Sequence, residues 1–268
     1  MDFKQKVLKI VKNIPKGEFL SYQQVAKLAG NKKAARAVGN FMAQNQNPAV
    51  FCHRVVKSNS EVGGYSGGHK LGWKKLGLLL REGVIAVMPT DTIYGICGSA
   101  LNRKTVEKIY QLKQRSPGKP MIILISDLAE LSLFGVKPSL KELKILKKLW
   151  PGRISIILPI KNKDKKESLF YLHRGTSGLS FRLPKDKFLL KILKISGPVV
   201  APSANLEDKE PAGTINQARK YFGNSVVYYA GKKVYSKEPS TLIRFSNRKI
   251  EVLRKGADYK MLPLYLSK

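Results

Sequence analysis

The pattern of apolar residues changes at Val84, and this change constrains the fold more than any other feature of the 268-residue chain. Residues 84–88 form a short apolar run that is typical of a buried strand. Beyond it, helical periods alternate with strand-like runs, which predicts an α/β domain with a mixed, twisted sheet. The expected helices cover residues 102–114, 138–149, 185–195 and 214–222. The expected strands cover residues 121–125, 154–160, 179–182, 198–201, 225–229, 240–245 and 250–254, and the lysine-rich segment 161–167 is expected to be an exposed loop.

The residues before Val84 instead favour helices. Apolar residues recur at helical spacing in residues 2–13. Ser21 followed by Gln24 is a capping-box pattern, which predicts that a second helix starts there. Gly30 should end that helix, because glycine adopts the left-handed conformation that commonly follows a helix.

A third helix is expected over residues 32–44 and a last one over residues 70–83. The second and third of these helices are short and are joined by a tight turn at Gly30, which indicates a helix-turn-helix. The glycine-rich segment 63–68 would be its wing. No linker separates this part from the first strand. We therefore predict a chain that is α/β overall. It is divided into a winged helix-turn-helix domain at residues 1–83, an α/β domain at residues 84–258 and a short tail at residues 259–268.

Positive charge extends through the whole chain, whose formal net charge is +32. Divided at Gly83, the first part carries +11 and the remainder +21, so neither is a neutral domain with a basic tail. Such a charge attracts polyanions, nucleic acids above all. A lysine-rich surface that only interacts with water is the alternative, and composition leaves both open.

The composition also limits the other classes of function. The two cysteines, Cys52 and Cys97, are expected to be free thiols, and the three histidines lack metal-ligand spacing, so no zinc site is predicted. No apolar run reaches the roughly 18–20 residues that a membrane span needs, and no secretory segment is evident. We expect a cytoplasmic protein that does not enter the membrane.

A cysteine, a histidine and an arginine stand together at residues 52–54. A thiol with a pKa of about 8.5 is mostly protonated at neutral pH, so a nucleophilic cysteine needs a base beside it. Further short motifs surround this triplet in a fixed order: Ser21-Tyr22, the segment 34–39, Asn47-Pro48, Val55-Val56 and Gly64-Tyr65. Together they make residues 1–83 resemble the active domain of alkylguanine-DNA alkyltransferases.

This resemblance implies a protein that moves an alkyl group from guanine in double-stranded DNA to its own cysteine, once per molecule. Cys52 would be the acceptor, His53 the base and Glu82 the carboxylate that orients His53. The damaged base has to leave the duplex stack to be reached. DNA contacts and the shape of the active-site loop would fall to Tyr22, Arg36 and Asn45 or Asn47.

Two features depart from that family. Phe51 stands where a proline is usual, and the segment between the asparagine and Cys52 is shorter. The alternative is therefore a DNA- or RNA-binding module without chemistry. The joint presence of Cys52, His53 and Glu82 favours the alkyl acceptor.

A second ordered set of motifs follows Val84. It comprises residues 89–95, 113–121, 150–152, 181–184, 201–205, 239–241 and 253–256. With these motifs, residues 84–258 resemble the YrdC/TsaC family, the threonylcarbamoyl-AMP synthases.

This resemblance implies an enzyme that condenses L-threonine, bicarbonate and ATP into threonylcarbamoyl-AMP and pyrophosphate, for modification of tRNA. A triphosphate needs several fixed cations, and Mg²⁺ would accompany it. ATP would be bound by Lys113, Arg115, Lys119, Asn205, Thr214 and Arg254. Threonine would be bound by Thr92, Arg182, Ser203 and Ser240, with Thr90 and Tyr94 shaping that end.

Three positions depart from the usual family pattern. Leu124 replaces a histidine, Gly178 replaces a serine or threonine, and Glu207-Asp208 replaces Ser-Gly. An RNA-binding member of the superfamily without synthase activity is the alternative. We predict a bifunctional chain in which a synthase is fused to an alkyltransferase.

Overall fold

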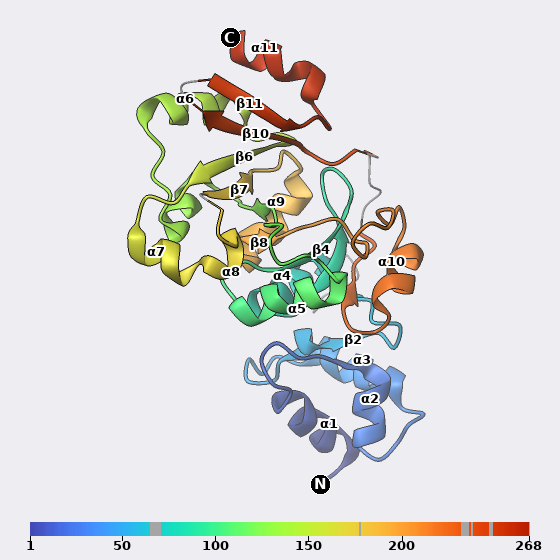
Figure 1. Cartoon of the computed structure of the whole chain (residues 1–268). Helices are drawn as coiled ribbons and strands as arrows, with labels where there is room; N and C mark the ends of the chain where they lie inside the picture. Colours follow the sequence, from blue (N-terminus) through green and yellow to red (C-terminus); the bar gives the residue numbers. More distant parts are fainter. Residues whose placement is uncertain (65–70, 177, 232–235, 237, 247–248, 268) are drawn as a thin grey trace.

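The computed structural model describes residues 1–64, 71–176, 178–231, 236, 238–246 and 249–267. A smaller, mostly helical part made from the N-terminal residues lies against one side of a larger α/β part (Figure 1). Most of the predicted wing, from residue 65 to residue 68, lies outside the described residues. None of the described helices is long and apolar enough to cross a membrane.

The N-terminal part is built from helices, as predicted, with one short parallel strand pair. Its elements are α1 (Phe3–Lys12), β1 (Leu20–Ser21), α2 (Tyr22–Leu28), α3 (Ala35–Gln44), η1 (Cys52–Arg54), β2 (Val55–Val56) and α4 (Gly72–Glu82). The predicted capping box is present, because Ser21 Oγ accepts from Gln24 N at 3.1 Å and Gln24 Oε1 accepts from Ser21 N at 2.6 Å. Helix α3 starts at Ala35, later than predicted, and its N-cap residue Ala34 supplies no side-chain hydrogen bond.

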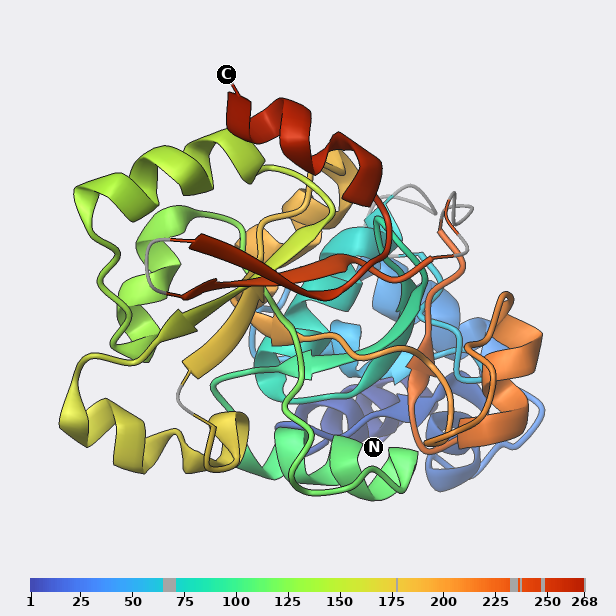
Figure 2. The ribbon, with the colours of Figure 1, turned by 45° about the horizontal axis from the view of Figure 1, so that its top comes forward.

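The larger part contains a twisted mixed sheet, as predicted (Figure 2). Among the described residues the strand order is β11-β10-β6-β7-β5-β8-β4-β3-β9. The sheet contains parallel pairs, such as β5 with β7, and antiparallel pairs, such as β6 with β7. The strands are β3 (Ala86–Pro89), β4 (Tyr94–Ser99), β5 (Ile123–Leu124), β6 (Ile154–Pro159), β7 (Gly178–Arg182), β8 (Val199–Val200), β9 (Val227–Tyr228), β10 (Thr241–Ser246) and β11 (Lys249–Arg254).

Helices and helical turns surround this sheet. They are α5 (Arg103–Lys113), η3 (Leu128–Phe134), α6 (Leu140–Leu149), α7 (Lys163–Ser168), α8 (Phe170–His173), α9 (Lys187–Ser196), α10 (Ile215–Phe222), η4 (Tyr259–Met261) and α11 (Leu262–Ser267). The expected loop at 161–167 is largely the exposed helix α7, which the sequence analysis missed because a fully polar helix has no apolar period. Its start is stabilised by Asn162 Oδ1, which accepts from Lys165 N at 2.8 Å.

The C-terminal residues do not form a loose tail. Turn η4 leads into α11, and α11 lies beside α6 in both views (Figures 1 and 2). Leu262, at the start of α11, is buried in the core of the α/β part. The tail prediction therefore missed a packed element that is too short for a clear helical period.

Helix α4 joins the two parts into one core. Its apolar residues Leu76, Leu79 and Leu80 are fully buried in a cluster that also contains residues of α9 and of the sheet. At Gly77 a Cβ atom would lie 2.8 Å from Ile195 Cβ, so only glycine permits this close approach of α4 to α9. The predicted boundary at residue 83 is thus crossed by continuous apolar packing.

Polar contacts reinforce the same junction. Gly83 ends α4 with φ +100°, and its carbonyl accepts a hydrogen bond of 2.8 Å from Thr105 Oγ1. A short segment of the N-terminal part also extends the sheet beyond β9, since Val62 N donates to Tyr228 O and Tyr228 N donates to Ser60 O, both at 2.9 Å. These bonds fix the end of α4, which carries Glu82.

Candidate active sites

The turn η1 places Cys52 at the centre of a cluster in the N-terminal part. Its thiol is buried and accepts a hydrogen bond of 3.2 Å from Asn45 Nδ2. The same Nδ2 donates to Asn47 O at 2.9 Å, so Asn45 connects the end of α3 to the cysteine loop. Burial raises the pKa of the Cys52 thiol, and the bond from Asn45 and the nearby Lys75 oppose that rise only in part. Forming the thiolate therefore requires a base.

His53 and Glu82 come together although they are far apart in the sequence. His53 Nε2 lies 2.9 Å from Glu82 Oε1, and both side chains are largely buried. Arg54 binds the same carboxylate with two nitrogens, at 2.7 Å from Nε to Oε2 and 2.9 Å from Nη2 to Oε1. Burial alone would raise the pKa of Glu82, but the contacts with Arg54 and His53 hold it at about 2. Glu82 is therefore a fixed negative charge facing the imidazole.

Phe51, the residue in the usual place of proline, packs against this ion pair. The guanidinium carbon of Arg54 lies 3.8 Å from the centre of the Phe51 ring, a cation–π contact. Arg54 Nη1 also donates to Ile14 O at 2.6 Å, which connects the cysteine turn to the end of the first helix. The role of Arg54 is visible only in three dimensions.

Lys75, on α4, is a second residue that the sequence analysis missed. Its ammonium is buried and donates to the Val55 carbonyl, with the Tyr22 hydroxyl at 3.5 Å. Burial lowers the pKa of Lys75 to about 7, although the nearby Cys52 opposes that shift. The available signal was a lysine on the apolar face of a predicted amphipathic helix.

The other predicted DNA-contacting residues lie around this cluster. Tyr22 is half-buried and packs against the apolar cluster that contains Cys52. Burial, and to a smaller extent the charge of Cys52, raises the pKa of Tyr22. Arg36 is exposed on α3, and Asn47 is exposed in the loop before the cysteine, where its Oδ1 accepts from Ala49 N at 2.9 Å. The structure thus gathers Cys52 with Asn45 and Tyr22 and leaves Arg36 and Asn47 at the surface.

A cavity of about 480 Å³ lies in the α/β part. Among the predicted site residues that line it are Thr90, Thr92, Arg115, Arg182, Ser203, Ser240 and Arg254. They come from strands and loops spread over most of the α/β part. The sheet therefore assembles into one site motifs that are distant in the sequence.

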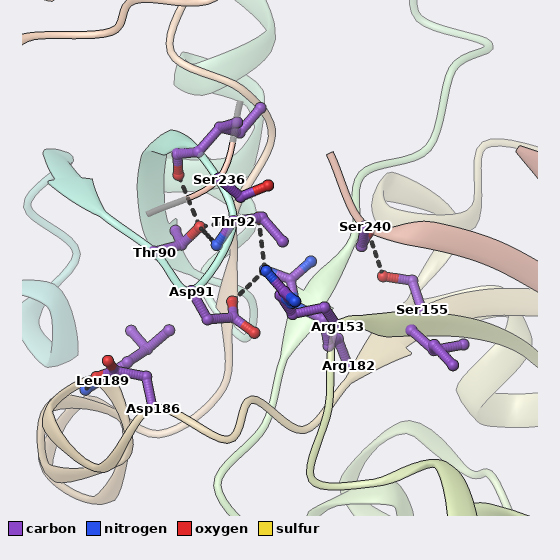
Figure 3. Close-up of polar contacts among 12 residues, drawn as sticks. Thr90, Asp91, Thr92, Arg153, Ser155, Arg182, Asp186, Leu189, Ser236 and Ser240 are labelled. Carbon is purple, nitrogen blue, oxygen red and sulfur yellow. Dashed lines mark hydrogen bonds and ion pairs between the residues drawn. The ribbon is translucent and has the colours of Figure 1, made fainter. Parts of the chain in front are cut away.

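Arg182, at the end of β7, lines the cavity and extends towards Asp91 and Thr92 (Figure 3). Its Nη2 lies 2.9 Å from Asp91 Oδ1 and 3.5 Å from Thr92 Oγ1, and the side chain is almost fully buried. Asp91 was absent from the predicted set. Asp91 Oδ2, Arg182 Nε and Ser180 Oγ are buried and have no hydrogen-bond partner in the described part of the chain. Of these residues Ser180 and Arg182 line the cavity, so Ser180 Oγ and Arg182 Nε have unused hydrogen-bonding capacity beside it.

Further lining residues of the cavity come from the start of β10 and the end of β11. Ser240 Oγ and Ser155 Oγ are hydrogen-bonded at 2.8 Å (Figure 3). Arg254 donates from Nε and Nη2 to Ser240 O at 3.1 and 2.9 Å. Burial lowers the pKa of Arg254, and the charges of Arg182 and Arg115 lower it further. Three guanidinium groups therefore concentrate positive charge here.

Four of the predicted ATP residues lie outside the cavity lining: Lys113, Lys119, Asn205 and Thr214. The Lys113 ammonium is buried and donates to Ser203 O, Asn205 O and Asn205 Oδ1 at 2.6 to 3.0 Å. Burial lowers its pKa to about 7. Lys113 and Asn205 together brace the loop that presents Ser203. Thr214 caps α10, where its Oγ1 accepts from Gln217 N at 3.2 Å.

Two departures from the family pattern have local physical reasons. Gly178 lines the cavity, and a Cβ there would lie 2.5 Å from the Leu158 carbonyl oxygen, so β6 and β7 leave no room for a side chain. Leu124 is fully buried in the apolar cluster around α4. Cys97, the second cysteine, is buried too, and burial raises its pKa to about 12.

Comparison with known proteins gives one family match for each part. Residues 78–256 match the Sua5–YciO–YrdC model, described as telomere recombination. Residues 2–84 match the model of the 6-O-methylguanine DNA methyltransferase DNA binding domain. The two matches meet at the end of α4.

Individual relatives agree with these matches. A putative threonylcarbamoyl-AMP synthase of Methanocaldococcus jannaschii is 35% identical over 66% of this chain and 82% of its own length. The methylated-DNA–protein-cysteine methyltransferase of Rattus norvegicus is 44% identical over 37% of this chain and 46% of its own. A solved structure of Sua5 from Pyrococcus abyssi has a TM-score of 0.61 and 25% identity, covering 69% of this chain and 57% of its own.

The chain spans unequal shares of the curated relatives it matches. It covers 37% of the threonylcarbamoyl-AMP synthase of Bacillus subtilis and under half of the rat methyltransferase. The synthase match nevertheless includes most of the chain and the motifs that line the cavity. Residues 2–84 match the 6-O-methylguanine DNA methyltransferase DNA binding domain, and the chain belongs to the Sua5–YciO–YrdC family.

Proposed function

We propose that residues 84–258 form a threonylcarbamoyl-AMP synthase and residues 1–83 a winged-helix DNA alkyltransferase. The observation that carries the first proposal is the cavity, which Arg115, Arg182 and Arg254 line and beside which Ser180 Oγ and Arg182 Nε have no hydrogen-bond partner in the described part of the chain. A ligand with several negative charges and a small polar end fits such a site. The synthase relatives and the family match support the same reaction.

The chemistry requires two bonds to form. The amine of L-threonine takes up bicarbonate with loss of water, and the resulting carbamate oxygen then attacks the α-phosphorus of ATP. The bond from that phosphorus to the β-phosphate bridge breaks, and pyrophosphate leaves. A displacement of this kind depends mainly on positioning and on neutralising charge. Arg182, held between Asp91 and Thr92, would bind the threonine carboxylate, and Arg115 and Arg254 would face the phosphates.

The further ligand assignments follow the same division. Thr92, Ser203 and Ser240 would complete the threonine end, and P. abyssi Sua5 has been solved with L-threonine. Lys113, Lys119, Asn205 and Thr214 would serve the nucleotide end. In the described part of the chain, no three His, Cys, Asp or Glu side chains gather into a metal site. Mg²⁺ would enter with the triphosphate, as it does at many nucleotide sites.

The test is release of pyrophosphate by the purified full chain. Release should require threonine, bicarbonate and ATP together. Arg182→Lys keeps the positive charge but cannot bind a carboxylate through two nitrogens as a guanidinium does. We expect a loss of at least about a hundredfold in rate. Arg103→Lys, at an exposed position of α5, is the matched control and should keep full rate. If all three substrates release no pyrophosphate while tRNA still binds, the chain is an RNA-binding member of the family.

The second activity is favoured by the Cys52 cluster. Its thiolate would attack the alkyl carbon on the guanine oxygen, so a sulfur–carbon bond forms and the carbon–oxygen bond breaks. Burial keeps the thiol protonated at neutral pH, so His53, held by Glu82, would take the proton directly or through one water. Helix α3 would present Arg36 to the DNA, in the recognition-helix arrangement of helix-turn-helix proteins.

Intact-mass measurement tests this activity. The chain is incubated with duplex DNA that contains a methylated guanine, beside a Cys52→Ala control. A gain of one methyl group that is absent from the control is the expected result. DNA binding without any gain in mass would instead make the N-terminal part a binding module.

A further inference from the structure

A carboxylate already occupies part of the surface assigned to the nucleotide. Glu207 Oε2 accepts from Ser116 N at 2.5 Å and from Ser116 Oγ at 2.8 Å. Glu207 Oε1 forms an ion pair with Lys119 Nζ. The Glu207 side chain is only 13% exposed, whereas that of Lys119 is 56% exposed. Glu207 is also the residue that replaces the serine usual in the family.

These three donors have the chemistry of a phosphate site. A backbone N–H, a hydroxyl and an ammonium that converge on one anion are what phosphate oxygens bind. The segment that supplies them, residues 115–120, continues directly into the cavity wall. Arg115 and Pro120 line the cavity, and Arg115 Nε donates to Lys119 O at 2.9 Å.

Glu207 connects this segment to the loop at residues 203–211. Its backbone N donates to Lys113 O at 2.8 Å, and the neighbouring Ser203 and Pro211 line the cavity. The contacts with Lys119 and Ser116 lower the pKa of Glu207 to about 2, so its carboxylate stays charged at neutral pH. The negative charge therefore lies between two segments, residues 115–120 and 203–211, that both contribute residues to the cavity lining.

We propose that Glu207 fills a phosphate-binding position, and that the triphosphate of ATP must displace it to reach Ser116 and Lys119. This inference rests on the proposed synthase function. Glu207 is then a positioning residue that orders the segment in the empty enzyme and weakens ATP binding. One ammonium cannot pair fully with both anions, and a carboxylate left beside the phosphates repels them.

Calorimetric titration of the full chain with ATP tests the proposal. Glu207→Gln keeps the shape and an acceptor for Ser116 but removes the charge. We expect its Kd for ATP to fall about threefold to tenfold, the range of a partly exposed ion pair with charge-assisted hydrogen bonds. Inorganic tripolyphosphate should show the same gain, and the Kd for L-threonine should not change.

Two further variants make the result specific. Asp208→Asn removes the same charge one residue away, at an exposed position, and should leave the Kd for ATP nearly unchanged. In a Lys119→Met background, Glu207→Gln should give a smaller gain, because one of the three donors for which the two anions compete is then absent. If Glu207→Gln lowers the melting temperature, Glu207→Asp, which keeps the charge but shortens its reach, should also tighten ATP binding.

The outcomes separate this inference from the synthase reaction. An unchanged or weaker affinity for ATP in a folded Glu207→Gln chain refutes the inference, and so does an equal gain without Lys119. A wild-type chain that binds ATP but releases no pyrophosphate refutes the synthase proposal. That result would leave the affinity comparison valid.

Discussion

Replacing Glu82 by glutamine should destabilise the whole chain, because it leaves the buried Arg54 guanidinium without its charged partner. Arg54 holds Glu82 with two hydrogen bonds, and His53 contacts the same carboxylate. The Glu82 pKa of about 2, against an ordinary value of 4.5, corresponds to about 3 kcal/mol of interaction free energy. Breaking a buried ion pair typically costs about 3–5 kcal/mol. Both routes give a loss of about 3 kcal/mol at neutral pH.

The pH dependence has a definite sign. The folded-state pKa of Glu82 lies below its unfolded value, so its contribution to stability is fully present above about pH 4.5. It is lost as the pH falls towards 2, because protonating the carboxylate has the same effect as the substitution. The difference in stability between the wild-type chain and Glu82→Gln should therefore shrink below about pH 4.5.

Urea and thermal denaturation of the full chain, followed by circular dichroism, measure this effect. A loss of about 3 kcal/mol corresponds to a melting temperature lower by about 6–10 °C. Because α4 joins both parts in one core, the synthase part should unfold in the same transition. Glu18→Gln, at an exposed position of the N-terminal part, is the control. A loss below about 1 kcal/mol at pH 7, or a difference that does not change below pH 4.5, would refute this reasoning.

Three other predictions concern the junction, the cavity and the thiol. Gly77→Ala should destabilise the chain by about 1–3 kcal/mol in urea denaturation, because the new Cβ meets Ile195. Alanine has the higher helix propensity, so a more stable variant would contradict the close packing. Gly178→Ser should cost about 2 kcal/mol or more and reduce pyrophosphate release, because its Cβ would overlap the Leu158 carbonyl, and unchanged stability and rate would refute this. The single-turnover rate of methyl transfer should rise between pH 6 and pH 9, because burial raises the Cys52 pKa and the thiolate fraction grows with pH; a flat profile would contradict it.

The local elements of the fold could be predicted where the sequence carries a local cause. The capping box of Ser21 and Gln24 sets the start of α2, and Gly83 ends α4 in the left-handed conformation. Alternation of apolar runs predicted the mixed sheet. Helix α7 was missed because no residue of it is buried, so its sequence has no apolar face to detect.

The candidate sites were predictable only as far as the motifs extend. Cys52, His53 and Glu82 were singled out, and so were the cavity arginines Arg115, Arg182 and Arg254, whereas Arg244, which also lines the cavity, was not. Lys75 was missed, because its place beside the thiol depends on how α4 packs against the cysteine turn. Asp91 was missed as well, although it stands inside a quoted motif, because only the fold shows that it binds Arg182.

The sequence by itself determined the residue types, the order of the motifs and the two family resemblances, since these depend only on neighbours along the chain. The tertiary structure decided which charges meet. Glu82 lies between His53 and Arg54, and Glu207 holds Lys119, across separations in sequence that no periodicity encodes. The physical reason is that burial makes a charge depend on its spatial partners, and those partners are set only when α4 and the sheet pack into one core.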